Sequence, residues 1–289
     1  MKKLIAMLMA AAMVLSLYAC GSGDSGDDKS GETAKAETEV KAADFKEKVL
    51  FDNDQCTFTV KAIDSSASTY SLSVAMVNKS DLDLTFTLDY ATINGWTIGT
   101  LWADTVTAGM SGNSSIEFAS SDLKAAGISD VQCIELHLRV YDDNDWVNNL
   151  VDETYTIYPL GAESFDVTYR EKADSDIVLV DTDEYSVIVT GFDPDNVWGY
   201  TMTLYLCNKT DKYLMFSTEN TAINGTMCDP FWASAVAPHS QEYSDVSWSD
   251  SALEESGIDS VSEISFPLSI RDYYDIGDLL NETYTITAQ

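Results

Sequence analysis

The sequence predicts an all-β protein that contains two tandem antiparallel β-sandwich domains. Three observations support this fold class. The tripeptide Ile93-Asn94-Gly95 returns as Ile223-Asn224-Gly225, at an offset of about 130 residues that flanking residues share. Apolar and polar residues alternate along the candidate strands, as expected of strands with one buried face. The helix signal is limited to one short turn in each repeat.

Each Ile-Asn-Gly is interpreted as a hairpin turn. A two-residue type I′ turn needs a positive φ at both centres, which Asn and Gly tolerate. Leu82–Leu88 precedes the first copy with an apolar residue at every second position, and Leu214 and Phe216 share one face before the second. A contact between the Asn side chain and a ligand is the alternative interpretation.

The repeat extends through most of the chain. Matched pairs include Asn78–Asp81 with Asn208–Asp211, Phe86 with Phe216, Trp102 with Trp232, Leu123 with Leu253, and Glu153–Ile157 with Glu282–Ile286. Two copies are too few for a solenoid, so each copy must close its own core. We therefore expect a first module at 46–160, a linker at 161–176 and a second module at 177–289. The recurring tryptophans, Trp102 and Trp232, are assigned to the cores.

Strands of the first module are expected near 49–52, 56–63, 70–78, 82–88, 96–106, 114–118, 131–141 and 153–158, of which 96–106 is the least regular. Ser121–Gly127 predicts one helical turn, and Asp250–Gly257 is its counterpart. One-faced strands with short turns predict two antiparallel sheets packed face to face. A helical turn late in the module is typical of an immunoglobulin-like sandwich.

The N-terminus has the features of an export signal. Lys2 and Lys3 precede the uncharged apolar stretch Leu4–Leu17, which is too short for a membrane span. Residues 1–19 are therefore predicted to be a signal peptide. Residues 20–45 contain almost no large apolar side chains after the cysteine, so we expect a flexible linker there.

Leu17-Tyr18-Ala19-Cys20 resembles the lipobox of bacterial lipoproteins, although Tyr18 is larger than the residue usual at that place. The chain resembles the immunoglobulin-like modules of uncharacterised Gram-positive surface lipoproteins. The features that carry this resemblance are the lipobox, the Asn-Lys-Ser/Thr-Asp turn, the Ile-Asn-Gly turn and the Leu-x-x-x-Gly-Ile helical turn. The resemblance implies lipidation of Cys20 and attachment to the cell membrane through two acyl chains. It implies no activity. An ordinary cleaved signal and an uncleaved anchor are the alternatives.

The chain is strongly acidic, with a formal charge of −32. Removal of residues 1–19 takes away Lys2 and Lys3 and no acid, which leaves a charge of −34 (14 − 48). Such a chain repels nucleic acid. His137 and His239 do not match between the repeats, and the chain has no Cys-x-x-Cys, nucleophile elbow or phosphate-binding glycine loop. We therefore predict no catalytic residues, no metal site and no cofactor.

Four cysteines follow Cys20, and none recurs in the other module. Cys56 shares the buried face of its strand, whereas Cys133 alternates out of phase with Ile134, so these two form a poor pair. Cys207 and Cys228 are the remaining candidate pair within one module, and an exported chain can be oxidised.

The predicted ligand site combines two loops of the second module. The loop after the second strand, 192–198, and the loop before the last strand, from 272, are expected to meet at one pole of the sandwich. Aromatic faces bind sugars or cations, and carboxylates bind Ca²⁺. Ordinary turn formation is the alternative reading of these loops. The acidic loop of the first module, 142–146, also ends in Trp. The candidate ligand-binding residues are Asp193, Asp195, Trp198, Asp272, Tyr273 and Tyr274.

The predicted function is that of a membrane-anchored extracytoplasmic lipoprotein with a non-enzymatic binding or adhesion role. The expected partners are the membrane, through lipidated Cys20, and a glycan, a cation or an envelope protein. Nucleic acid is excluded by the charge. A purely structural surface spacer and a carboxylate-dependent glycan hydrolase are the alternatives.

Overall fold

The computed structural model describes residues 45–162 and 164–288, and these belong to one compact unit. The predicted signal peptide, Cys20 and nearly all of the predicted flexible linker lie outside the described residues. Strands dominate the described part of the chain, in which the helices are α1 (Ser120–Ala125) and α2 (Asp250–Glu255). The prediction of an all-β fold is confirmed.

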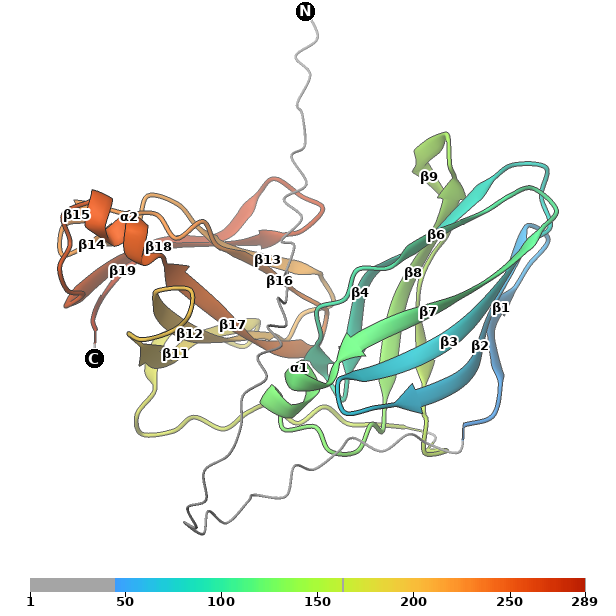
Figure 1. Cartoon of the computed structure of the whole chain (residues 1–289), viewed down its shortest axis with the longest axis horizontal. Coiled ribbons are helices and arrows are strands. Elements are labelled where there is room, and N and C mark those ends of the chain that lie inside the picture. The colour runs from blue at the N-terminus through green and yellow to red at the C-terminus, as the bar shows by residue number, and fades with distance from the viewer. Residues whose placement is uncertain (1–44, 163, 289) are drawn as a thin grey trace, which may run out of the picture. The chain divides into compact units, whose positions relative to one another are not determined.

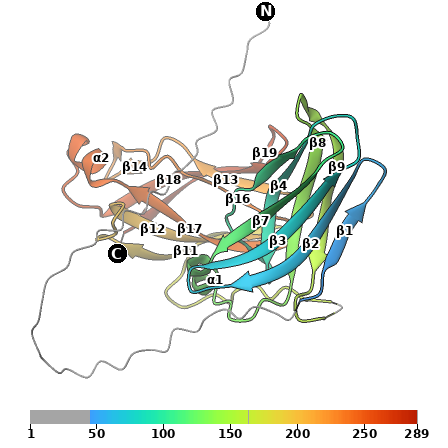
Figure 2. The same ribbon diagram turned by 45° about the vertical axis from the view of Figure 1, so that its right-hand side comes forward.

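The first module consists of two antiparallel sheets packed face to face (Figure 1, Figure 2). One sheet has the order β1-β2-β3-β7, with bounds Lys48–Asp52, Cys56–Ser65, Thr69–Asn78 and Ser111–Ala119. In the other sheet, β4 pairs with β5, β6 and β8, and β9 pairs with β8. These five strands are Leu84–Ile93, Trp96–Thr97, Ala103–Val106, Ile134–Asp142 and Asp145–Ile157. The segment predicted as one strand at 96–106 is thus two short strands.

The second module repeats this plan. The strands β10-β11-β12-β17 pair in this order, with bounds Ile177–Asp181, Tyr185–Asp193, Tyr200–Asn208 and Ser240–Trp248, and they continue through β5 into the strands β4, β8 and β9 of the first module as one nine-stranded sheet. In the other sheet, β18 pairs with β13, β14 and β19, while β15 and β16 pair with β14 and β13. The bounds of these strands are β13 (Leu214–Thr218), β14 (Ala222–Ile223), β15 (Thr226–Met227), β16 (Ala233–Val236), β18 (Glu263–Asp272) and β19 (Asp278–Thr287).

The strand order is immunoglobulin-like once the first strand of each module is set aside. In the first module, β2-β3-β7 have the order A-B-E, and β6-β4-β8-β9 have the order C′-C-F-G. The helix α1 connects E to F. The preceding strand, β1 or β10, is an extra edge strand beside A. This extra strand changes which loops share a pole, as described below.

Each module has its own hydrophobic core between its two sheets. The alternating strand pattern produces these cores, because residues at every second position point inward. Trp102 and Trp232 are both buried, as predicted, and their indole Nε1 atoms donate to Ser114 Oγ and Ser244 Oγ at 3.1 and 3.0 Å. The largest fully buried side chains are Tyr70, Phe58, Phe86 and Phe118 in the first core and Trp248, Phe216 and Phe266 in the second.

Both Ile-Asn-Gly segments form the predicted hairpin turns. In the first, φ is 51° at Asn94 and 75° at Gly95, and β4 pairs with β5 across the turn. In the second, φ is 51° at Asn224 and 79° at Gly225. Positive φ at both centres is the type I′ geometry that matches the twist of the flanking strands.

The Asn side chain of each turn is bonded within its own module. Asn94 Nδ2 donates to the Asp130 carbonyl at 2.8 Å, and Asn94 Oδ1 accepts the Cys133 N–H at 3.0 Å. Asn224 Nδ2 donates to the Ser260 carbonyl in the equivalent position. Each turn is thereby fixed to the segment between the helix and the next strand, so its Asn has a structural role.

The hairpin of the first module also contacts the second module. Trp96 of β5 pairs in parallel with Gln241 of β17, and the Gln241 N–H donates to the Gly95 carbonyl at 3.0 Å. The hydroxyls of Thr97 and Ser240 are 2.6 Å apart. Through this contact the free edge of β17 is partly covered, which is how natural sheets protect edge strands from other partners.

The linker between the modules packs beside the same contact. The Gln241 side chain accepts the Arg170 N–H at 2.9 Å and the Tyr205 hydroxyl at 2.7 Å, and its Nε2 donates to the Thr168 carbonyl at 2.9 Å. A small apolar cluster surrounds this buried amide, formed by Ile188, Tyr205 and Cys207 with Trp96 and Tyr169. The linker and both modules are therefore held together by one set of contacts.

The four cysteines in the described part of the chain are buried and have free thiols. The candidate pair Cys207 and Cys228 is therefore not bridged. Cys207 belongs to the small cluster beside the linker, whereas Cys228 belongs to the core of the second module. Burial raises the pKa of the Cys56 and Cys133 thiols to about 11 and also raises that of Cys207.

All four buried thiols are shielded from reagents in the folded protein, and the raised pKa of Cys56, Cys133 and Cys207 also lowers the fraction of reactive thiolate at those three residues. Labelling with a thiol-specific reagent at pH 7.5 should leave Cys56, Cys133, Cys207 and Cys228 unmodified in the native chain. Unfolding in denaturant without reductant should add four labels. An increase of only two labels would mean that a disulfide exists.

Candidate functional site

The two loops predicted to share a pole lie at opposite ends of the second module. Asp193 pairs with Thr201 at the start of β12, so the 194–199 loop is at that end. Asp272 pairs with Leu214, which follows the other end of β12 after a short turn. The predicted meeting of these loops is therefore wrong. The extra strand β10 is the reason: the loop after the second strand joins A to B, whereas the loop after the third strand joins B to C and lies beside the F–G loop.

The first of these loops is organised by its own side chains. Asp193 Oδ1 accepts the Asp195 N–H at 3.1 Å, and Asn196 Oδ1 accepts the Trp198 N–H at 3.1 Å. These are the local bonds by which Asp and Asn form turns. The Trp198 side chain is 66% exposed. Among the residues predicted to bind a ligand, Asp193 and Asp195 therefore form the turn or face solvent, and Trp198 faces solvent.

The second loop lies against the first module through its tyrosines. The rings of Tyr273 and Tyr213 stack with their centroids 4.6 Å apart. Tyr213 in turn lies 4.8 Å from Tyr90 of the first module, and Tyr90 stacks on His137 at 4.7 Å. The result is a continuous row of aromatic rings that joins the B–C and F–G loops of the second module to the outer face of the C-F-G sheet of the first.

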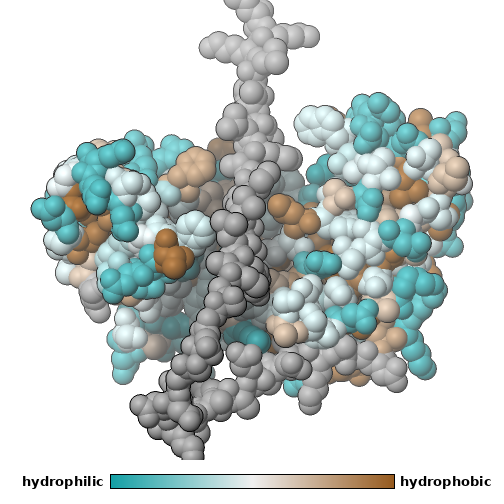
Figure 3. Space-filling view, in the orientation of Figure 1, coloured by the Kyte–Doolittle hydropathy of each residue, from teal (hydrophilic) through white to brown (hydrophobic). Residues whose placement is uncertain are grey.

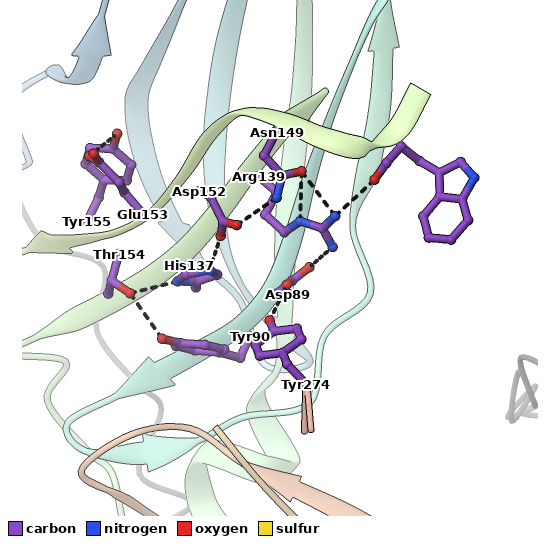
Figure 4. A network of polar contacts seen from close by, with 11 residues as sticks. Asp89, Tyr90, His137, Arg139, Asn149, Asp152, Glu153, Thr154, Tyr155 and Tyr274 are labelled. Atoms are coloured by element: carbon purple, nitrogen blue, oxygen red, sulfur yellow. Dashed lines mark hydrogen bonds and ion pairs between the residues drawn. The ribbon is translucent and has the colours of Figure 1, made fainter. Parts of the chain in front are cut away.

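Asp89 is the polar centre of this junction (Figure 4). The Tyr274 hydroxyl donates to Asp89 Oδ2 at 2.6 Å, and Arg139 Nη1 donates to Asp89 Oδ1 at 3.3 Å. The Asp89 side chain is only 14% exposed, so its charge is partly desolvated beside Arg139. Burial raises the pKa of Tyr274, and its hydrogen bond to Asp89 adds to that shift. Tyr274 is therefore a neutral hydrogen-bond donor at physiological pH.

Arg139 also connects this junction to the β8–β9 hairpin. Its Nε and Nη2 donate to Asn149 Oδ1 at 3.2 and 3.1 Å, and Nη2 donates to the Trp146 carbonyl at 3.3 Å. Arg139 is half-buried, and its guanidinium lies between the junction and the hairpin tip. Because its donors are planar and fixed in a fork, Arg139 holds the hairpin in one orientation relative to the sheet.

His137 lies between a carboxylate and a hydroxyl on the same face (Figure 4). Its Nε2 is 2.9 Å from Asp152 Oδ1, and its Nδ1 is 2.9 Å from Thr154 Oγ1. A carboxylate, an imidazole and a hydroxyl in this order can activate a nucleophile in hydrolases. Here the three side chains are cross-strand neighbours on β8 and β9, and the Tyr90 hydroxyl shares Thr154 Oγ1 at 3.1 Å. These side chains therefore act as cross-strand pairs that stabilise the sheet.

Among the described residues, the equivalent pole of the first module makes no such contact with the second. We call it the first-module pole and define it as residues 79–83, 107–110 and 142–150. Figure 1 shows the β8–β9 hairpin of this pole extending beyond the neighbouring strands. Its exposed apolar side chains are Leu82, Met110, Trp146, Val147 and Leu150, and Trp146 is 67% exposed.

The three segments of the first-module pole are joined by hydrogen bonds. The Gly109 N–H donates to the Ser80 carbonyl at 3.1 Å, and the Asp143 N–H donates to the Asp83 carbonyl at 3.0 Å. Asp83 Oδ1 also accepts the Ala108 N–H at 2.9 Å. The loops therefore form one supported surface, as recognition loops on a rigid sandwich do.

Sequence reasoning found only part of this pole. The acidic loop 142–146 and its Trp were noticed, but Leu82, Met110 and Val147 were not. The sequence does contain a signal for this surface, because large apolar residues lie inside turn segments, where they are not expected to be buried.

Among the described residues, no group of three or more His, Cys, Asp or Glu side chains is placed to hold a metal ion. The described helices are also too short or too polar to cross a membrane. The face seen in Figure 3 is largely hydrophilic, with apolar residues scattered over both modules. Large apolar side chains are also exposed elsewhere, as at Leu101, Phe231 and Ile276, so the first-module pole is distinguished by having five of them on segments that are hydrogen-bonded to one another.

The chain matches no family model, and no curated protein matches its sequence significantly. Among solved structures, a transglutaminase from red sea bream is similar over 86% of this chain and 32% of that chain, with 13% identity and a TM-score of 0.23. The chain therefore spans about a third of the length of that enzyme. A likeness at this level carries no argument about function.

Proposed function

We propose that the protein is a membrane-anchored extracytoplasmic lipoprotein whose modules bind another envelope or extracellular component without catalysis. The anchor is lipidated Cys20, and residues 20–45 tether the modules to the membrane. The first-module pole is the binding surface. The single observation that carries this proposal is the exposure of Trp146 and its apolar neighbours on loops that are fixed to one another.

The physical reason lies in what exposed apolar surface costs. A soluble module gains free energy by burying a Trp side chain, which covers about 150–250 Å². An exposed Trp on a supported loop forgoes that gain, and such residues are common anchors of binding surfaces. In the second module the same pole is in contact with the first module through Tyr213 and Tyr274, so the first-module pole is the one left for a partner.

A structural spacer is the second candidate function. The observation that favours it is the junction itself, because Tyr213 and Tyr274 contribute to contacts between the modules. Two modules held together in this way could present a distant surface without binding anything themselves. The two candidates differ in whether the first-module pole takes a ligand.

The anchor is tested by replacing Cys20 with serine. The variant cannot form the thioether, so it should be released from the membrane fraction into the medium, while the unaltered protein stays with the membrane. Membrane association that persists in the variant would contradict lipidation.

Binding is tested by titrating tryptophan fluorescence of the full-length protein in detergent. Wall fragments, soluble glycans and Ca²⁺ are the probes, and a response that disappears in Trp146→Ala supports a binding role. A flat response to every probe, together with normal anchoring, would favour the spacer.

A further inference from the structure

The two equivalent poles carry different chemistry. In the second module, the pole residues Tyr213 and Tyr274 contact the first module directly, and Tyr273 stacks on Tyr213. At the offset of 130 that relates the modules, the first module has Asp83, Asp143 and Asn144 in their places. Three aromatic side chains are thus replaced by two carboxylates and an amide, all of them exposed.

The pole of the second module shows what kind of surface this part of the fold can bind. It lies on the C-F-G face of the first module, where Tyr90 supplies a ring and Asp89 accepts the Tyr274 hydroxyl. At this contact, tyrosines of the second module meet the Tyr90 ring and the Asp89 carboxylate, which accepts a hydrogen bond. Because the first-module pole has carboxylates instead, the complementary surface must supply positive charge.

The exposed charges at the first-module pole are predominantly negative. Its carboxylates belong to Asp81, Asp83, Asp142, Asp143 and Asp145, whereas Lys79 is paired with Asp52. Trp146 and Val147 are each 67% exposed beside these carboxylates. An arginine side chain satisfies both features, because its guanidinium pairs with a carboxylate and also stacks on an indole face.

A second copy of this chain does not supply that surface through its second module. The positions equivalent to Asp89, Tyr90, His137 and Arg139 are Glu219, Asn220, Pro267 and Ser269. That face has lost both its cation and its rings. The corresponding face of the first module is already in contact with the second module of its own chain.

We propose that the first-module pole binds a protein segment in which arginine side chains alternate with apolar or aromatic ones. The carboxylates pair with the guanidinium groups, and Trp146 and Val147 contact the apolar side chains. This inference rests on the proposed binding function and specifies its partner class. Carboxylates alone would attract any cationic partner, and salt would weaken that attraction. The adjoining apolar residues add selectivity, because they favour a partner whose arginines alternate with apolar side chains.

The test uses the full-length protein in non-ionic detergent at physiological ionic strength. The probe is a fluorescein-labelled octapeptide of alternating arginine and phenylalanine, and binding is measured by fluorescence anisotropy. Two control peptides carry serine in place of phenylalanine or glutamate in place of arginine. The probe is expected to bind, and both control peptides should bind at least about fivefold more weakly.

Matched variants locate the binding surface. Trp146→Ala is expected to weaken probe binding by at least about fivefold, whereas Trp198→Ala, a tryptophan of equal exposure elsewhere, should change it by less than about twofold. Two double variants should show the same contrast. Asp143→Asn combined with Asp145→Asn is expected to weaken probe binding, whereas Asp193→Asn combined with Asp195→Asn should leave it nearly unchanged. Thermal unfolding of each variant shows that the fold is kept.

Equal losses in the paired variants would overturn the proposal, because they would show that the probe binds acidic surface in general. Failure of the unaltered protein to bind the probe would also overturn it. If the fluorescence response to wall fragments or glycans nevertheless depends on Trp146, the proposed binding function stands and only the partner class is wrong. If neither response exists, both proposals fail.

Discussion

Replacing Asn208 with alanine is expected to lower the free energy of unfolding by about 3–5 kcal/mol. Asn208 is completely buried, and its Nδ2 donates to the Lys212 and Val236 carbonyls at 2.7 and 3.0 Å. Its Oδ1 accepts the Thr210 N–H at 3.0 Å. Truncation leaves these buried groups without partners and also creates a cavity. Denaturant unfolding followed by far-UV circular dichroism measures the loss.

Asn78 makes equivalent contacts in the first module, so Asn78→Ala should cost a similar amount. It donates to the Leu82 and Val106 carbonyls at 2.7 and 2.8 Å. The matched control is Asn148→Ala, because Asn148 is exposed and bonds only at the surface with Asp145. That control should change stability by less than about 0.5 kcal/mol. Losses below about 1 kcal/mol for both buried asparagines would contradict their role as braces between loops.

Replacing Gly95 with alanine is expected to destabilise the protein more than the same change at Gly225. Both glycines have positive φ, 75° and 79°, so both variants pay the strain of a left-handed alanine, about 1–2 kcal/mol. A Cβ at Gly95 would lie 2.5 Å from Val167 Cγ1, whereas nothing lies within 4 Å of one at Gly225. The overlap with the linker should add about 1–3 kcal/mol.

The comparison of the two alanine variants isolates the contact between hairpin and linker. Denaturant unfolding gives the difference in stability, and limited proteolysis reports on linker exposure. The Gly95→Ala chain should be cleaved faster between residues 161 and 176 than the Gly225→Ala chain. Equal stability losses and equal cleavage rates would show that the linker does not pack on the hairpin in solution.

Much of the fold could be predicted because local patterns determine it. The Asn-Gly turns, the alternation in β3 and the repeated tryptophans each follow from nearby residues, and the repeat tests every assignment twice. The division of 96–106 into β5 and β6 was missed because neither piece is long enough to show a period. The edge strand β1 was predicted at 49–52, but the effect of β1 and β10 on loop placement depends on sheet order, which local pattern does not contain.

The candidate site was harder to predict, because it depends on contacts between residues far apart in the sequence. Tyr213, Tyr273 and Tyr274 look like surface tyrosines in a loop until the C-F-G face of the first module is placed against them. The useful signal was the difference between the repeats. Trp96 stands where the second module has Thr226, and Asp83 stands where it has Tyr213. Such differences indicate where each module has its own contacts.

The most direct test of a binding surface at the first-module pole is amide chemical-shift mapping with the arginine–phenylalanine peptide. Shifts on titration are expected in residues 79–83, 107–110 and 142–150, while residues 194–199 and 273–277 stay unchanged. Shifts that fall instead in either loop of the second module, or that spread evenly over acidic surface, would contradict the claim that the first-module pole is the recognition site.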